Sequence, residues 1–361
     1  IDSLRERHVM TLRTRLGNLG NILDESVEQC DHLLLDSPVL TNSEWTHLIE
    51  HLGAKAVEIN CQFDSHGGEN SLKNALEAIQ ILAENAVRGG CEHVMLSDSD
   101  ISPSKAPIPM ILAVGAVHSH LVRQQLRTFA SVNVASGECL DVHHFAVLIG
   151  VGATTVNPYG AEWAIAERKE KGLVKSLSMK EAVTNYKTAI ELGLLKIMSK
   201  MGISVLSSYR GGYNFEALGL SRSLVVDYFP PMSSRISGLG LSGIQTRVLE
   251  MHKRAFSSDV TYLPVGGQFK YRKSGEAHAF DGQVIHAMQH ACNTGSYDSW
   301  KKYVSMVSRQ GPVNLRDLLD FTPSKPSLSV EKVESITDIR RRLVSPGISL
   351  GALSPEAHET L

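Results

Sequence analysis

The stretch 194–212, which reads LLKIMSKMGISVLSSYRGG, decides the fold. Apolar residues recur at helical spacing as far as Met201, and Gly202 stands where the C-terminal cap of a helix belongs. Residues 203–206 then predict a buried strand, and this strand opens onto the polar and glycine-rich run 209–212. A helix, a glycine breaker and a strand in this order make half of a βα repeat. The stretch therefore predicts a parallel α/β fold, in which binding residues follow the carboxyl ends of the strands.

The same alternation of helices and strands runs through most of the chain before residue 256. Its periodicity predicts helices over 42–51, 71–88, 107–126 and 142–150, a helical run ending near 256, and strands over 56–60, 93–96, 129–134 and 154–156. The helix at 42–51 has Asn42 or Ser43 as its expected N-cap. Residues 12–23, which include glycines, predict instead an irregular connector packed on the surface of a neighbour.

Beyond residue 260 the pattern changes. Two short extended runs at 262–267 and 269–272 precede helices that we expect at 281–292, 297–310 and 313–319. A linker with Pro323 and Pro326 follows, and 329–343 predicts a helix or a pair of turns. Ser354 is a good helix N-cap and Pro355 a good first helical residue, so we expect the last residues to begin a further βα piece.

Composition and charge exclude some classes of function. The chain has 361 residues, 42% of them hydrophobic, and a net charge of −2. The densest basic run is 340–342, at an expected helix end, so neither nucleic acid nor an anionic membrane is the expected partner. The sequence shows no apolar span of membrane length and no signal peptide, which predicts a soluble intracellular protein. The five cysteines are scattered and odd in number, as in a protein with reduced thiols.

Two motifs resemble ligand sites when they are read alone. The run SDSD at 97–100 resembles a metal or sugar-hydroxyl site, but alternating Asp and Ser also bond to their own loop backbone, and we favour this second role. The run GLGLSG at 238–243 fits the dinucleotide pattern Gly-x-Gly-x-x-Gly. The preceding residues, PPMSSR at 230–235, do not predict a buried strand, so we interpret the glycines as turns.

Histidines offer three further candidates for ligands. His118 and His120 are two apart on a predicted helix, where they point to different sides and form no metal-binding face. The pair at 143–144 begins a helix, where capping or core packing is the expected role. His286 and His290 are four apart and could chelate zinc, but the Glu of a His-Glu-x-x-His metalloprotease helix is absent.

The segment 136–159 follows the plan of a phosphate-binding unit. A turn at 136–138 leads into a helix, a strand and then Asn-Pro-Tyr at 157–159. The late units of (β/α)8 barrels bind phosphate with such a glycine turn and helix N-terminus. Glu138 and Asp141, however, place two carboxylates where a phosphate needs amides and positive charge. We therefore interpret the segment as barrel scaffolding without a phosphate site.

Several blocks of the sequence become informative when they are taken together. They are APIPM at 106–110, AVGAVH at 113–118, VHHFAVLIG at 142–150, VNPY at 156–159, SKMGIS at 199–204, SYRG at 208–211, LPVGG at 263–267, LLDF at 318–321 and SLGALSPEAHE at 349–359. In order and spacing, over essentially the whole chain, these blocks resemble the central domain of the glutamate synthase large chain with the start of its FMN-binding domain. Ser119 departs from the pattern, since relatives tend to carry another histidine between His118 and His120.

The resemblance implies a fold and a domain organisation. The fold class is α/β, a reduced (rudimentary) TIM-barrel-like domain with a C-terminal helical appendix. Residues 1–28 would connect from the glutaminase domain, 29–328 would form the central α/β domain, and 329–361 would be a linker and the first βα piece of the FMN-binding barrel. The location would be intracellular, in the cytoplasm or a plastid.

The resemblance also implies a noncatalytic role within an oxidoreductase. The segment would space the glutaminase and FMN synthase sites of the same chain, and would help to form the ammonia passage for L-glutamate synthesis from glutamine and 2-oxoglutarate. FMN and an iron–sulfur cluster belong to the full enzyme, and we expect neither in this segment. The closely spaced cysteine triplet that holds the cluster and the N-terminal cysteine nucleophile of the glutaminase are both absent from this sequence.

Candidate site residues lie at two places in the chain. The interdomain or passage candidates are Tyr209, Arg210, Gly211 and Gly212. Arginine suits carboxylate recognition across an interface, tyrosine brings apolar area with a polar tip, and the glycines allow close packing or a narrow lining, with ordinary barrel packing as the alternative.

The second place is 349–354, which matches the first strand of the FMN domain. Gly351, Ala352 and Leu353 are therefore candidates to contact FMN through backbone groups in the full enzyme. No catalytic or metal-binding residue is assigned. Two other functions stay open, namely a self-sufficient FMN-dependent barrel oxidoreductase and a pure interdomain docking scaffold.

Overall fold

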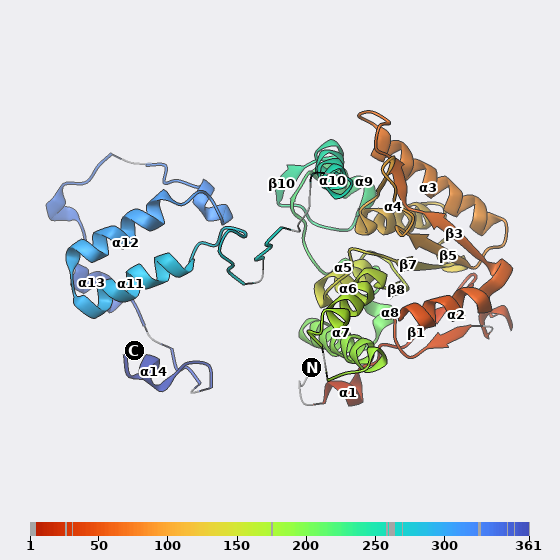
Figure 1. The fold of residues 1–361 in the computed structure, drawn as a ribbon, viewed down its shortest axis with the longest axis horizontal. Coiled ribbons are helices and arrows are strands. Elements are labelled where there is room, and N and C mark those ends of the chain that lie inside the picture. Colours follow the sequence, from red (N-terminus) through yellow and green to blue (C-terminus); the bar gives the residue numbers. More distant parts are fainter. Residues whose placement is uncertain are drawn as a thin grey trace. The chain divides into compact units, whose positions relative to one another are not determined.

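The structure is a computed structural model that describes residues 5–25, 27–30, 32–174, 176–257, 259, 264–268, 270–323, 326–344, 346–349 and 351–360. Its contacts divide the chain into two compact units, Ile1–Thr261 and Tyr262–Leu361. The first unit is built of helices and strands, and the described part of the second is built of helices and loops (Figure 1). The extended runs expected at 262–267 and 269–272 lie partly outside the described residues.

The elements of the first unit alternate along the sequence. Its helices are α1 (Glu6–Val9), α2 (Asn42–Leu52), α3 (Ser71–Arg88), α4 (Met110–Arg123), α5 (Val142–Gly150), α6 (Tyr159–Glu170), α7 (Met179–Met201), α8 (Leu206–Tyr209), α9 (Arg222–Tyr228) and α10 (Leu241–Ala255). Its strands are β1 (Thr14–Leu16), β2 (Leu33–Leu35), β3 (Ala56–Asn60), β4 (Gln62–Asp64), β5 (His93–Ser97), β6 (Lys105–Pro107), β7 (Ser131–Ala135), β8 (Thr155–Asn157), β9 (Leu218–Leu220) and β10 (Ile236–Leu239). Short 3-10 turns lie at η1 (Val27–Cys30), η2 (Gly53–Lys55) and η3 (Arg127–Phe129).

A four-stranded parallel sheet forms the centre of the first unit. Its strand order, β3-β5-β7-β8, follows the sequence, with α3, α4 and α5 as successive connections. The register pairs Ala56 with His93 and His93 with Ser131. Beyond β8, Val39 adds a single parallel bridge to Val156. The predicted α/β class is confirmed, whereas a TIM-like barrel is not, because the order of the sheet is open.

The two faces of the sheet carry different side chains. Residues alternate between faces along each strand, and one face is apolar through Val94 and Leu96 of β5 and Val132 and Val134 of β7, all in the main hydrophobic core. Helices α3 and α4 lie on this side, and α2 with β1 lies on the other (Figure 1). Burial of this apolar face is the main driving force for the fold.

The opposite face carries buried polar residues joined by hydrogen bonds across the strands. His93 Nδ1 lies 2.8 Å from Ser131 Oγ, Asn133 Nδ2 donates to the same oxygen, and Thr155 Oγ1 donates to Asn133 Oδ1 at 2.8 Å. All four residues are buried. Burial also lowers the pKa of His93, which keeps the ring neutral. None of the fully buried side-chain nitrogens and oxygens of these four residues lacks a hydrogen-bond partner, so this face is buried at little cost in lost hydrogen bonds.

Helix α2 begins with a capping box. Thr41 Oγ1 accepts the backbone N–H of Glu44 at 3.3 Å, and Glu44 Oε2 accepts the N–H of Thr41 at 2.8 Å. The expected helix at 42–51 is confirmed, but its N-cap is Thr41 rather than Asn42 or Ser43. The capping-box spacing of Thr41 and Glu44 is visible in the sequence and identifies this cap.

Replacement of Thr41 by alanine is expected to lower the free energy of unfolding of the first unit by about 1 kcal/mol, because the N–H of Glu44 loses its acceptor. Chemical unfolding at neutral pH measures this difference. Thr46→Ala on the same helix is the matched control, since its hydroxyl only bonds back to the carbonyl of Asn42 and alanine favours the helix. Equal effects of the two substitutions would contradict the capping role.

Two predicted strands are wrong. Residues 203–206 form no strand, since only Val205 makes a bridge, to Thr11, and Leu206 already begins α8. The helix and cap before them are confirmed, because α7 ends at Met201 and Gly202 adopts the left-handed conformation. Of the run 349–354, Leu350 lies outside the described residues; the others form no strand, and the N–H of Ala352 donates to Ser349 O. Each run is apolar enough for a strand, but a strand also needs a partner along its length.

Two more expectations need correction. The segment 12–23 is not wholly irregular, since β1 pairs with β2 in antiparallel register, and Leu12 and Leu16 are buried in the first unit. In GLGLSG, Gly238 lies within β10 rather than in a turn. A Cβ on Gly238 would lie 2.2 Å from the carbonyl oxygen of Gly219 in β9, so this glycine allows the two strands to approach.

The described part of the second unit is helical. It contains α11 (Gly282–Thr294), α12 (Tyr297–Arg309), α13 (Ile336–Arg341) and α14 (Pro355–Thr360), with 3-10 turns η4 (Leu315–Leu318) and η5 (Val330–Lys332). Helices α11 and α12 pack as a hairpin around Gly295, which has a positive φ of 60°. Ser354 and Pro355 begin α14 as predicted, and the N–H of Ala357 donates to Ser354 Oγ.

Candidate functional site

The carboxyl edge of the parallel sheet gathers polar residues from three connections. Asp98 follows β5, Ser136 and Gly137 follow β7, and Tyr159 begins α6 just after β8. Parallel strands place their carboxyl ends at one edge, which is why residues far apart in sequence meet there. This edge is therefore the place where an α/β fold would carry a ligand.

Asp98 is the centre of this edge. It is 4% exposed, and it accepts hydrogen bonds from Ser136 Oγ at 3.1 Å, the Gly137 N–H at 2.9 Å and Tyr159 Oη at 2.6 Å. Burial raises the pKa of Asp98, and the three donors only partly offset this effect. Within the SDSD run, the N–H of Ser99 donates to Ser97 Oγ at 3.3 Å, as the favoured interpretation expects, whereas Asp98 bonds to residues of other connections.

Backbone N–H groups that could hold a phosphate at this edge already have carboxylate partners. The N–H of Met110, at the start of α4, donates to Glu138 Oε1 at 2.5 Å. The N–H of His144, at the start of α5, donates to Asp141 Oδ1 at 3.2 Å, and Gly137 is bonded to Asp98 as above. Glu138 and Asp141 lie at the starts of α4 and α5, where the helix dipole favours a negative charge. The edge is thus filled with the chain's own anions.

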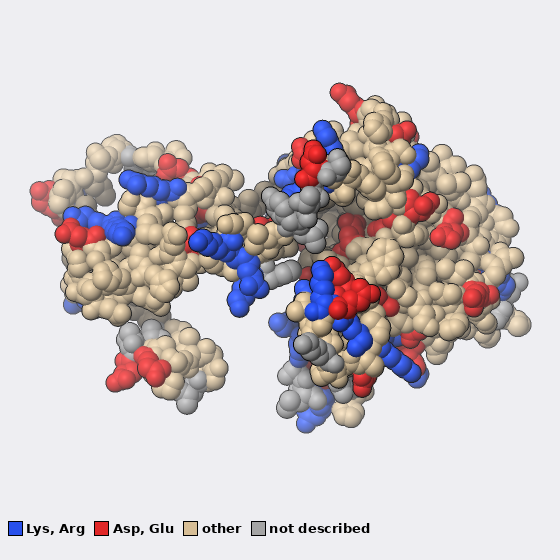
Figure 2. Space-filling model, viewed as in Figure 1, with Lys and Arg blue, Asp and Glu red and all other residues tan. Residues whose placement is uncertain are grey.

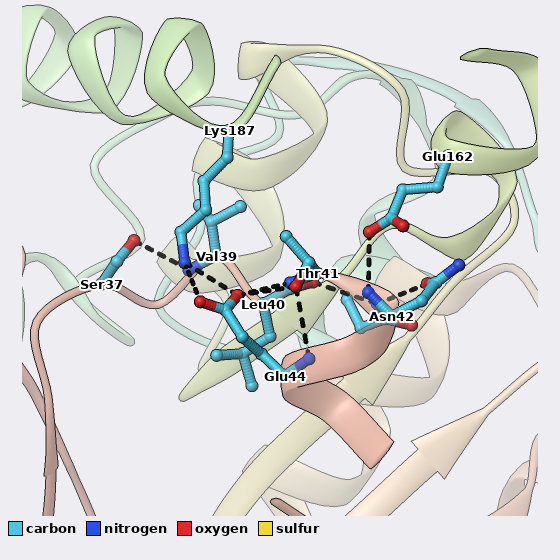
Figure 3. A network of polar contacts seen from close by, with 9 residues as sticks. Ser37, Val39, Leu40, Thr41, Asn42, Glu44, Glu162 and Lys187 are labelled. Carbon is cyan, nitrogen blue, oxygen red and sulfur yellow. Dashed lines mark hydrogen bonds and ion pairs between the residues drawn. The ribbon is translucent and has the colours of Figure 1, made fainter. Parts of the chain in front are cut away.

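A polar network leads from this edge to the start of α2. Asn157 Nδ2 donates to the carbonyl of Leu40 at 3.0 Å and to Asn42 Oδ1 at 2.9 Å. The N–H of Asn42 in turn donates to Glu162 Oε1 at 2.7 Å, as Figure 3 shows. Glu162 is 8% exposed, and burial raises its pKa. The network fixes α2 and α6 to the end of β8.

The network ends at an ion pair beside a groove. Lys187 Nζ of α7 lies 2.7 Å and 2.8 Å from the two carboxylate oxygens of Glu44 in α2 (Figure 3). The groove has a volume of about 920 Å³, and its lining includes Leu12, Leu48 and Leu195 together with this pair. Glu44 and Lys187 are 143 positions apart, and no motif connects them, so the sequence analysis did not find this pair.

The passage candidates have different surroundings. Tyr209 is 1% exposed, and its hydroxyl donates to the carbonyl of Ala146 in α5. Arg210 Nη1 donates to Thr14 Oγ1 at 3.3 Å. Gly211 has a positive φ of 68°, and a Cβ there would lie 3.2 Å from the His118 ring, whereas Gly212 is exposed. Their role at an interface or passage stays a prediction.

The histidine candidates have structural partners. His118 and His120 contact different groups, Arg127 and Glu84, so they point apart as predicted. His144 Nδ1 accepts the N–H groups of Leu140 and Asp141, which is the expected capping role. His286 and His290 lie on α11. Among the residues that the structure describes, no group of three His, Cys, Asp or Glu side chains is placed to hold a metal ion.

The surface of each unit carries both acidic and basic side chains. On the face shown in Figure 2, acidic and basic residues are interspersed among uncharged ones, and no long basic stripe is visible. In the part of the chain that is described, no helix has the length and apolar character needed to cross a membrane. The five cysteines are free thiols, and Cys61 and Cys139 are buried.

Two family models match the chain. The model described as the glutamate synthase central domain matches residues 1–221, and the one described as a conserved region in glutamate synthase matches residues 278–361. The chain belongs to the glutamate synthase family. The resemblance inferred from the sequence blocks is thereby confirmed.

Relatives match along the whole chain. It is 56% identical over 361 residues to the glutamate synthase NADPH large chain of Azospirillum brasilense, covering 100% of this chain and 24% of that relative. It is 37% identical over 364 residues to the corresponding large chain of Bacillus subtilis and 37% over 373 residues to the ferredoxin-dependent glutamate synthase of Pyropia yezoensis, again covering 100% of this chain and 24% of each relative. The chain thus spans about a quarter of the length of these relatives.

Solved structures add little to this family assignment. A mutant flavocytochrome b2 with pyruvate bound aligns with 46% of this chain and 49% of its own, at 15% identity and a TM-score of 0.29. That score is too low to define a shared fold.

Proposed function

We propose that this chain is a noncatalytic central segment of a glutamate synthase large chain. Its membership of the family supports its place in a glutamate synthase. The carboxyl edge, which the chain's own carboxylates fill, supports the noncatalytic role. Three helix or turn N–H groups that would hold a cofactor phosphate in an α/β domain bond instead to Asp98, Glu138 and Asp141. A phosphate at this edge would meet three carboxylates, and repulsion would disfavour it.

The finer role that we propose is to set the distance between a glutaminase site and an FMN synthase site, and to help enclose the ammonia that passes between them. Ammonia protonates in water at neutral pH, so transfer needs a route closed to solvent. Interlocked packing of α2, α6 and β8 through Asn157, Asn42 and Glu162 supports a rigid spacer. The neighbouring domains would be the glutaminase and FMN domains of the same chain, and FMN and the iron–sulfur cluster would be bound outside this segment.

We also propose that the sheet is a reduced version of a (β/α)8 barrel. Its strand order follows the sequence, as in a barrel, and the Val39 bridge adds one further parallel position beside β8. Gly351, Ala352 and Leu353 remain proposed contacts of FMN in the full enzyme. A location in the cytoplasm or a plastid is part of the same proposal.

The absorption spectrum of the purified 361-residue chain tests the noncatalytic role. We expect no flavin band after expression in cells supplied with riboflavin, because the carboxyl edge repels the FMN phosphate. Flavin at a near-stoichiometric ratio would support instead a self-sufficient FMN-dependent oxidoreductase. The full-length protein, prepared in parallel, is the positive control, since it should carry flavin.

The passage proposal has a separate test in the full-length enzyme. Gly211→Phe is expected to lower glutamine-dependent synthesis more than ammonia-dependent synthesis, because the new ring would crowd His118 and obstruct a passage lined here. Gly202→Phe is the matched control, since Gly202 has a similar positive φ of 75° and no other atom within 4 Å of a Cβ. If Gly211→Phe leaves glutamine-dependent synthesis, ammonia-dependent synthesis and glutaminase activity in the same ratios as in wild type, Gly211 does not line a passage. The result would then support a pure docking scaffold.

A further inference from the structure

Two arginines lie near the start of β7, at the opposite edge of the sheet from Asp98. Arg127 bonds to His118, and a Cβ on Gly211, the residue after Arg210, would lie 3.2 Å from the same ring. Arg127, in η3, uses all its side-chain nitrogens within the fold. Its Nε donates to His118 Nδ1 at 2.9 Å, Nη1 to the carbonyl of Ala130 at 2.6 Å, and Nη2 to the carbonyl of Gly152 at 2.9 Å. These bonds fix the guanidinium in one orientation, but none of the acceptors carries a negative charge.

Arg210 is the second arginine. Among the described residues, its side chain has one hydrogen-bond partner, Thr14 Oγ1, to which Nη1 donates at 3.3 Å. Within the described ranges, the one fully buried side-chain nitrogen or oxygen that lacks a partner is His32 Nδ1. The unbonded N–H groups of Arg210 therefore have some access to solvent, although the residue as a whole is only partly exposed.

This pair of arginines lacks a counter-ion in the part of the chain that is described. No Asp or Glu among the described residues lies within the 4.0 Å of an ion pair from either guanidinium. Burial, followed by the nearby charge of Arg210, lowers the pKa of Arg127 to about 9. Both arginines are still charged at neutral pH. Two like charges in a poorly solvated place are unfavourable unless an anion joins them.

His118 adds a donor to this cluster. Burial, followed by the charges of Arg127 and Arg210, lowers its pKa to about 3, so the ring is neutral. Because Nδ1 accepts the N–H of Arg127, the ring proton is assigned to Nε2, which then becomes a donor. Nε2 lies beside Gly211, where a Cβ would come within 3.3 Å of it. Nothing larger than glycine therefore fits on that side of the ring without crowding it.

We propose that Arg210, backed by Arg127 and by the Nε2–H of His118, forms a binding site for an oxyanion. A carboxylate is the best fit, since a guanidinium with free N–H groups binds both its oxygens in one plane. The oxyanion comes either from a free small molecule or from an Asp or Glu side chain elsewhere in the full-length protein. Arg210 and its neighbour Gly211 are also passage candidates, but the tests of the two proposals use different readouts, which are sulfate affinity for this site and the two synthesis activities for the passage.

The first experiment measures sulfate binding to the full-length protein by calorimetry, at constant ionic strength maintained with chloride. A free oxyanion site predicts saturable binding that Arg210→Gln weakens by about 10- to 100-fold, the loss of one or two charged hydrogen bonds. Arg247→Gln is the matched control, because Arg247 is exposed on α10 and makes no ion pair with a described residue. It should leave the sulfate affinity unchanged.

The second experiment distinguishes the source of the oxyanion. In Arg210→Lys, a carbodiimide joins the introduced amine to any carboxylate in direct contact with it, and peptide mapping finds the partner. A cross-link to an Asp or Glu, together with no sulfate binding, supports a carboxylate of the protein itself. Sulfate binding that requires Arg210, without a cross-link, supports a free oxyanion. The proposal is overturned if neither appears, or if Arg210→Gln and Arg247→Gln bind sulfate equally well.

Discussion

Replacement of Gly160 by alanine is expected to lower the free energy of unfolding of the first unit by about 3 kcal/mol. Gly160 is the second residue of α6, and a Cβ there would lie 2.3 Å from the carbonyl oxygen of Gly137 and 2.9 Å from its Cα. These neighbours are backbone atoms, so no side chain can rotate away to relieve the overlap. The first turn of α6 must move instead.

Movement of α6 has a second cost at the carboxyl edge. Tyr159 precedes Gly160 and donates to Asp98 at 2.6 Å, and Glu162, two residues after Gly160, accepts the N–H of Asn42 at 2.7 Å. A shift large enough to clear the Gly137 oxygen lengthens both bonds, and each buried bond lost costs about 1–3 kcal/mol. The estimate for Gly160→Ala therefore combines overpacking with a weakened network.

Chemical unfolding of wild type and variant gives the difference directly. Gly240→Ala is the control, because its nearest atom, Ser221 Oγ, would lie at an ordinary 3.6 Å from the new Cβ. As an N-cap change from glycine to alanine, it should cost less than about 1 kcal/mol. If Gly160→Ala is as stable as Gly240→Ala, α6 does not pack tightly on the 136–138 turn.

Local signals in the sequence predicted much of this fold. The bounds of α3 at 71–88, of α5 at 142–150 and of β3 at 56–60 agree with the structure, because periodicity, caps and glycine breakers lie within each element. The strand at 203–206 failed for a physical reason. Its apolar residues match a strand, but only Val205 finds a partner, and no local pattern shows whether a partner exists.

The candidate site was less predictable because its contacts span long separations. The sequence placed 97–100 at the end of a strand, but it could not show that Tyr159, 61 positions later, would donate to Asp98. The cluster of Arg127, Arg210 and His118 follows no spacing rule. It forms where the backbone at 211–213 bonds to the end of α5, beside a histidine of α4. One feature of the site was predictable from the sequence. The negative charges of Glu138 and Asp141 were enough to argue against a phosphate site there.

Ordinary α/β domains use free helix N-termini at the carboxyl edge to bind anionic cofactors. Here the chain's own carboxylates occupy these positions, and Asn157 and Glu162 tie the edge to α2. These bonds make the carboxyl edge rigid, and they occupy the groups that would otherwise bind a ligand. Both effects are consistent with a domain whose proposed task is to hold other sites at a fixed distance.

Replacement of Asp98 by alanine is expected to lower the free energy of unfolding of the first unit by about 3–4 kcal/mol at pH 5. Three donors, Ser136 Oγ, the Gly137 N–H and Tyr159 Oη, lose their acceptor together. Each buried unsatisfied group costs about 1–3 kcal/mol, and the lower part of that range applies to groups that water can reach. Asp98→Asn is the matched variant, since its carbonyl oxygen can still accept from Gly137 and Tyr159.

The effect of Asp98→Ala on the free energy of unfolding should depend on pH, and the pKa of Asp98 gives the direction. The pKa of Asp98 is raised above 3.8 in the folded state, chiefly by burial, so the folded state binds the proton more tightly than the unfolded state. The stability that this difference contributes is complete below the unfolded pKa and is lost as the pH rises through the folded pKa. The difference in free energy of unfolding between wild type and Asp98→Ala should therefore become smaller from pH 4 to pH 7. A gap that widens over this range would mean that the three donors outweigh burial and hold the folded pKa below 3.8.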